Sequence, residues 1–113
     1  KLQPFGIHHC GDNLHRVAAE YAKLPLAYAE AGWGSDIAKV RAALPDVFLN
    51  LRLSPIRMLQ CTPPEITEDT EKLLRAAAPL DKVGLCCINL DYGTPDDNLA
   101  AMYAVVERYR RGA

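Results

Sequence analysis

Two residues with metal-binding chemistry, His8 and Cys10, lie two positions apart at the end of an apolar run. Side chains alternate along a β-strand, so these two point to the same side of a strand predicted over residues 5–10. An imidazole nitrogen and a thiolate are a ligand pair that suits zinc. Taken alone, the pair is better interpreted as a small buried cysteine beside a hydrogen-bonded histidine.

Glu30 ends a second predicted strand, just before Gly32. A carboxylate at a strand end can serve as a metal ligand, as a base, or as the group that holds His8 in place. A solvated loop charge is the alternative, and it is favoured while Glu30 is considered by itself.

Asn50 and Arg52 share one side of a third predicted strand, and the leucines at 49, 51 and 53 share the other. An arginine that points inward from a strand end costs free energy unless it is paired with a carboxylate or meets an anionic ligand. Both interpretations remain open, so Asn50 and Arg52 are candidates for substrate binding.

Cys86 and Cys87 are adjacent, and adjacent residues of a strand face opposite ways. We expect Cys87 to face the shared site, together with Asn89 and Asp91 if the strand continues that far. Cys86 is then a small core residue, and Cys61, in a loop before a helix, is a bystander.

These residues fall at the ends of elements that alternate regularly along the chain. Apolar runs predict strands over residues 5–10, 25–30, 47–53 and 83–88. Between and after them, helical periodicity is opened by residues that favour N-caps, at Asp12, Ser35, Ser54, Thr62 and Thr94. The pattern is four consecutive βα units in one domain over residues 1–113, with a parallel sheet covered by helices.

Composition excludes several classes of protein. The 113 residues carry 13 Lys and Arg against 14 Asp and Glu, for a net charge of −1, which argues against nucleic acid as the main partner. It also argues against a polybasic membrane anchor, and no apolar run approaches the ~20 residues of a membrane span. The spacing of the four cysteines is not that of a disulfide scaffold, so we expect reduced thiols and a cytoplasmic location.

Four βα units are half of a (β/α)8 barrel; the other arrangement is a freestanding, doubly wound four-stranded sheet. Periodicity does not separate the two. A closed barrel brings strand ends around one mouth and would gather His8, Cys10, Glu30 and Cys87 as up to four zinc ligands.

The chain resembles the C-terminal half of the uroporphyrinogen decarboxylase superfamily of (β/α)8 barrels. The resemblance rests on HHCGDN at 8–13, AEAGWGSDIAKVRAALPD at 29–46, LNLRLSP at 49–55, TPPEI at 62–66 and CCINLDYGTPDDN at 86–98. It favours the zinc-dependent methyltransferase branch, because His-x-Cys is present at 8–10 and the decarboxylases' final His falls on Cys87.

The resemblance implies that His8, Cys10 and Cys87 bind Zn²⁺, with one position of doubt between Cys86 and Cys87. Glu30 would be a displaceable ligand or a supporting group in catalysis, and Arg52 would meet an anionic group of the substrate. A small thiol would accept a methyl group from a methylated corrinoid. The corrinoid would be either free or bound to a corrinoid protein, which would then be a partner of this chain.

Two other functions stay open. One is decarboxylation of a tetrapyrrole by a carboxy-lyase of the same superfamily. The other is a non-catalytic barrel half, which would assemble with further copies through its open edges.

Overall fold

The computed structural model describes residues 3–112, which form a sheet of four parallel strands in the order β1-β2-β3-β4. The strands are β1 (Phe5–His8), β2 (Leu26–Ala31), β3 (Phe48–Arg52) and β4 (Val83–Cys86). All four predicted strands are confirmed, with ends that differ by a few residues.

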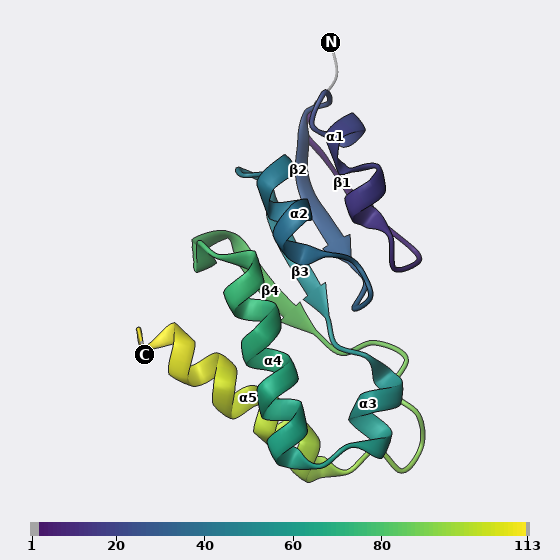
Figure 1. Cartoon of the computed structure of the whole chain (residues 1–113), viewed down its shortest axis with the longest axis vertical. Helices are drawn as coiled ribbons and strands as arrows, with labels where there is room; N and C mark the ends of the chain where they lie inside the picture. Colours follow the sequence, from purple (N-terminus) through teal and green to yellow (C-terminus); the bar gives the residue numbers. More distant parts are fainter. Residues whose placement is uncertain (1–2, 113) are drawn as a thin grey trace.

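The helices between and after the strands are η1 (Leu14–Arg16), α1 (Ala18–Tyr21), α2 (Ile37–Ala43), α3 (Pro55–Gln60), α4 (Pro63–Ala77), η2 (Leu80–Lys82) and α5 (Asp96–Arg110). Figure 1 shows α1, α2 and α4 lying over the sheet, whereas α3 and α5 lie toward the lower end of the view, beyond the strand ends. The α/β architecture predicted from the alternation is therefore confirmed.

The helices cover the sheet face formed by odd-numbered strand residues. Ala29, Leu49 and Leu51 are fully buried there, against α1, α2 and α4. A second apolar cluster joins the end of β3 to α3, α4 and α5 through Leu53, Met58, Ile66 and Met102. The leucines at 49, 51 and 53, which the sequence placed on the side opposite Asn50 and Arg52, are all buried in these two clusters.

Strand order follows chain order without a reversal. Successive parallel strands are joined by right-handed crossovers, so all the connecting helices fall on the same face of such a sheet. A doubly wound sheet needs a point at which the order reverses, and residues 3–112 contain none. The doubly wound alternative is therefore wrong for this chain.

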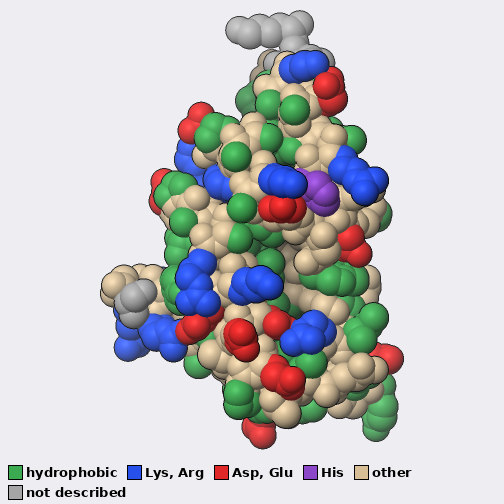
Figure 2. Space-filling view, in the orientation of Figure 1, with side chains coloured by type: hydrophobic (Ala, Val, Ile, Leu, Met, Phe, Trp, Pro, Cys, Tyr) green, Lys and Arg blue, Asp and Glu red, His purple; other side chains and the backbone are tan. Residues whose placement is uncertain are grey.

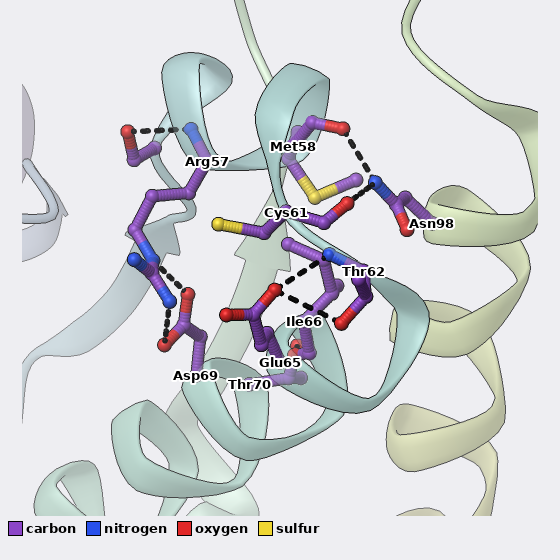
Figure 3. A network of polar contacts seen from close by, with 10 residues as sticks. Arg57, Met58, Cys61, Thr62, Glu65, Ile66, Asp69, Thr70 and Asn98 are labelled. Carbon is purple, nitrogen blue, oxygen red and sulfur yellow. Dashed lines mark hydrogen bonds and ion pairs between the residues drawn. The ribbon is translucent and has the colours of Figure 1, made fainter.

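Two of the predicted helix starts are confirmed as drawn from the sequence. Ser54 caps α3, because its hydroxyl accepts a hydrogen bond from the N–H of Arg57. Thr62 and Glu65 form a capping box at the start of α4 (Figure 3). Ser54 is followed by Pro55 and Thr62 by Pro63, whose fixed φ suits the first helical turn.

Three predicted caps are wrong. Asp36 rather than Ser35 caps α2, and the Ser35 hydroxyl instead accepts a hydrogen bond from the N–H of Leu14. The Thr94 hydroxyl donates to the Asp91 carbonyl and leaves Pro95 at the cap position of α5. Asp12 does not cap the first predicted helix. That helix is divided at Val17 into two short ones, η1 and α1.

The C-terminal helix α5 is anchored by one buried amide. The side chain of Asn98 donates to the carbonyls of Met58 and Cys61, both at 2.8 Å, and so ties the start of α5 to the end of α3 (Figure 3). The helical spacing of Leu99, Met102, Tyr103 and Val106 predicts an apolar face on α5. This prediction is wrong at Tyr103, which is 66% exposed. Figure 2 shows positive and negative side chains intermixed over the helical face. Within residues 3–112, no helix is long and apolar enough to cross a membrane.

Candidate functional site

The sheet face opposite the helices carries the polar residues of all four strands. We call these five side chains, from even-numbered positions on β1 to β4, the polar row: His8, Glu30, Asn50, Arg52 and Cys86. They share this face because the register sets His8 beside Glu30, Glu30 beside Asn50, and Arg52 beside Cys86.

His8 and Glu30 form the firmest contact of the polar row. The Nδ1 atom of His8 lies 2.8 Å from Oε2 of Glu30, and the side chains are 46% and 15% exposed. When Nδ1 donates its proton to the carboxylate, the lone pair of Nε2 is left free. This is the arrangement in which a carboxylate orients a metal-binding or proton-accepting imidazole, and it matches the predicted supporting role of Glu30.

Arg52 supports both Glu30 and the backbone ahead of Cys10. Its side chain is 6% exposed, with Nε 3.5 Å from Oε1 of Glu30. Its Nη2 donates to the His9 carbonyl at 2.9 Å, and its guanidinium lies 5.8 Å from the Trp33 ring centroid. Of the two predicted alternatives for this arginine, pairing with a carboxylate is the one that the structure contains.

Cys10 lies two residues past the end of β1 and is exposed with a free thiol. The ladder with β2 continues one residue past the strand, since the N–H of His9 donates to the Glu30 carbonyl at 3.4 Å. The loop after Cys10 packs closely against the loop that follows β2. A Cβ at Gly32 would lie 2.3 Å from the Gly11 carbonyl oxygen, so only glycine fits there. Close contact between two loops therefore fixes the backbone on both sides of Cys10.

Cys86, the last residue of β4, and the following Cys87 are oriented opposite to the prediction. The Asn50 amide donates to the Cys86 thiol at 3.4 Å, which places Cys86 in the polar row. Cys87 turns toward the helices, where its sulfur lies 3.1 Å from that of Met102 in the second apolar cluster. The predicted placement is wrong because β4 pairs with β3 in the register that sets Gly84 and Cys86 on the polar face.

The surroundings of both cysteines favour the protonated thiol. Burial raises the pKa of Cys86, and the nearby Glu30 carboxylate adds to the effect. Burial raises the pKa of Cys87 to about 11. A thiolate at Cys86 therefore requires additional positive charge, of the kind that a bound metal ion supplies.

Asn89 and Asp91 lie outside the polar row. β4 ends at Cys86, so the strand alternation that was expected to align them with Cys87 stops short of both. Asn89 is exposed with φ 56°, and the Asp91 carboxylate accepts a hydrogen bond from the N–H of Tyr92 at 2.8 Å. Their predicted role in substrate binding gains no support from this position.

Two residues of this face were not singled out from the sequence. The Tyr28 hydroxyl accepts a hydrogen bond from the Asn50 amide at 3.0 Å, and its ring stacks on Phe48 with centroids 5.9 Å apart. Tyr28 lies two residues before Glu30, so strand alternation was a usable signal. Trp33, against Arg52, lies past the strand end, where no comparable signal exists.

The predicted zinc ligands are not gathered within one chain. His8 and Cys86 lie on opposite edge strands, three strand spacings or about 14 Å apart. Among the described residues, no three His, Cys, Asp or Glu side chains form a group that could hold a metal ion. Comparisons with protein-family models, curated proteins and solved structures found no match.

Proposed function

We propose that this chain forms half of a (β/α)8 barrel of the zinc-dependent methyltransferase type, with the polar row lining its mouth. The observation that carries the proposal is the His8–Glu30–Arg52 chain of contacts, which leaves one imidazole nitrogen of His8 free, two positions before Cys10 in the sequence. Zinc, when bound, lowers the pKa of a coordinated thiol, so that its thiolate can take a methyl group from a methylated corrinoid.

The stagger of the strands supports a barrel. His8, Glu30, Asn50 and Gly84 are in register with one another across the four strands, and the strand ends are counted from this row. β1 ends at the row itself, and β2 ends one residue beyond it, at Ala31. β3 and β4 each end two residues beyond it. An eight-stranded barrel of this type has a total shear of about eight, or about one residue per strand. The strand ends therefore advance in one direction, by two residues over three strand steps, which is somewhat less than one residue per strand.

In this proposal, His8, Glu30 and Cys86 of the polar row and the nearby Cys10 have distinct tasks. His8 binds through Nε2, and Glu30 fixes the ring through Nδ1. Cys10 supplies a thiolate, and its position is fixed by Arg52, which donates a hydrogen bond to the carbonyl of the preceding residue, His9. Cys86 is the better third ligand, because the Cys87 thiol packs against Met102 on the other face.

Arg52 has a different task from the predicted one. A guanidinium that binds an anionic substrate must be free and accessible, whereas Arg52 is buried against Glu30 and the His9 carbonyl. We therefore propose it as a positioning residue. The same observation removes support from tetrapyrrole decarboxylation, which needs free basic groups to bind the carboxylates of the substrate.

Zinc analysis of the full chain tests the proposal. We expect zinc in the wild type and its loss in His8→Ala and Cys10→Ala. Cys86→Ala and Cys87→Ala form a matched pair, of which the first should lose zinc and the second should keep it. Failure of the wild type to bind zinc, or unchanged binding by Cys10→Ala, would overturn the proposal in favour of a non-catalytic barrel half.

A further inference from the structure

Both edges of the sheet are open in the described chain. β1 and β4 have four residues each and a single neighbouring strand. On β4, the Cys86 carbonyl faces β3 and accepts from the N–H of Leu53, so the peptide groups of Val83 and Leu85 face outward. Open parallel edges of this kind are sites for further strand pairing.

The uncovered sheet face has the character of a barrel interior. The large rings of Tyr28 and Phe48 stack there, and glycines on the neighbouring strands make room for them. A Cβ at Gly6 would lie 3.1 Å from Tyr28, and one at Gly84 would lie 3.0 Å from Phe48. Parallel sheets occur with both faces covered, so this face is expected to be covered in the working protein.

With a stagger of about one residue per strand, inward side chains of alternate strands come to the same height in a barrel. Residues of β1 then share a level with residues of β3: His8 with Arg52, and Gly6 with Asn50. Residues of β2 likewise share a level with residues of β4: Glu30 with Cys86, and Tyr28 with Gly84. Each level thus receives two side chains from this chain, whereas the levels of a closed barrel hold four. A glycine shares its level with a larger side chain in two of the four cases, and one of these side chains is the ring of Tyr28.

We infer that a second copy of this chain closes the barrel, with β1 of each copy pairing with β4 of the other, and that the two copies share each metal site. The two-fold arrangement supplies the missing two side chains at every level. The inference rests on the proposed function for the metal, although the strand pairing stands on the geometry of the sheet alone.

Three features favour a second copy as the occupant of the open face. The two edges that must pair have the same length of four residues and run parallel. One copy supplies four strands, which is half of the eight in a closed barrel of this type, so two copies supply all eight. The inward face also carries one carboxylate and one guanidinium, Glu30 and Arg52, which are already paired, so closure buries no net charge.

The arrangement also explains why one chain does not gather the ligands. Within a copy, Cys86 lies three strands from His8, but the partner's Cys86 lies on the adjacent strand. There it is a diagonal neighbour, with about 7–8 Å between the two backbones. His8 and Cys10 of one copy and Cys86 of the other can then meet at one ion.

The mass of the purified full chain in solution tests the pairing. We expect a dimer in light scattering after size-exclusion chromatography, independent of zinc if the sheet edges drive association. A monomer at high concentration, or an open-ended series of larger species, would overturn the closed two-copy barrel.

Complementation between variants tests the shared site. His8→Ala and Cys86→Ala would be co-expressed with different affinity tags, and the mixed dimer would be isolated over both columns. Each variant alone should hold no zinc, whereas the mixed dimer keeps one intact site and should hold about one zinc per two chains. A doubly tagged His8→Ala dimer is the matched control and should hold none.

The outcomes separate the two proposals. A mixed dimer without zinc, beside a wild type that binds zinc, would overturn the shared site and leave the proposed function standing. A dimeric wild type that binds no zinc would overturn the proposed function and the shared site together, while the pairing of the edges would survive.

Discussion

The Nδ1 atom of His8 and the Oε2 atom of Glu30 are 2.8 Å apart across the first two strands, at the point where these residues are in register. The other carboxylate oxygen of Glu30 faces the buried guanidinium of Arg52. Glu30 therefore carries a single negative charge that serves two partners, and this makes it the residue on which the site depends most.

Glu30→Gln should destabilise the fold, because it leaves the buried Arg52 charge without a counter-charge. Breaking one partner of a buried pair typically costs about 3–5 kcal/mol, and the partial exposure of Glu30 argues for the lower end of that range. Urea denaturation measures the change in free energy of unfolding. The double variant with Arg52→Met should recover part of the loss, and a double variant as unstable as the single one would contradict the pairing.

Gly32→Ala should disturb the loop that carries Cys10 without removing any polar group. The added Cβ would lie 2.3 Å from the Gly11 carbonyl oxygen and 2.9 Å from Nη2 of Arg52, so the two loops must separate. Overpacking of this kind typically costs about 1–3 kcal/mol. Gly93→Ala is the control for added bulk, since no atom lies within 4 Å of a Cβ there, although its φ of +89° adds strain of its own.

Thermal denaturation would compare the two glycine variants. The loop contact is refuted if Gly32→Ala melts at the wild-type temperature. It gains support if Gly32→Ala also alters the alkylation rate of the Cys10 thiol, which Gly93→Ala should leave unchanged because Gly93 lies in a different loop.

The sequence was informative wherever a residue's neighbours along the chain decide its environment. Alternation identified the buried face of β3, and the Thr62 capping box follows from local chemistry. It was uninformative for β4, whose apolar run from 83 to 88 is continuous and therefore gives no alternation. The orientation of Cys86 and Cys87 is decided by pairing with β3, a contact between segments more than 30 residues apart.

The first helix shows a second limit of local patterns. Leu14, Val17, Ala18 and Tyr21 have helical spacing, yet the helix is interrupted at Val17. The backbone N–H of Leu14 is bound by the Ser35 hydroxyl, and Asp12 accepts from the N–H of Gly34. Both partners come from the loop after β2, so tertiary contacts replace the cap that the sequence predicted.

Arg41→Lys should be strongly destabilising although it keeps the charge. The buried guanidinium donates to the carbonyls of Ala77, Val47 and Lys82 at 2.9, 2.8 and 3.0 Å, and joins α2 to the ends of α4 and η2. Lysine cannot reach three separated carbonyls, so the change should cost about 2–4 kcal/mol. The exposed Arg75→Lys on α4 is the matched control, with an expected change under about 0.5 kcal/mol.

The raised pKa of Cys87 makes the stability of the fold depend on alkaline pH. Burial raises that pKa from 9.0 to about 11, so the folded state keeps the thiol protonated where the unfolded state has lost its proton. The contribution of the protonated Cys87 thiol to the free energy of unfolding is fully present below pH 9 and is lost as the pH rises toward about 11. Urea denaturation across this range should show a decline in the free energy of unfolding that is smaller in Cys87→Ala than in the wild type.

The same shift predicts the order in which the thiols react with iodoacetamide. The thiolate is the reactive form, and the raised pKa lowers the thiolate fraction of the half-buried Cys87 roughly 100-fold at pH 8, so Cys87 should be alkylated much more slowly than the exposed Cys10. Mass spectrometry of digested samples follows each site separately. Equal rates in the folded protein would contradict the packing of Cys87 against Met102, whereas equal rates in urea are expected because unfolding removes the burial that raises the pKa.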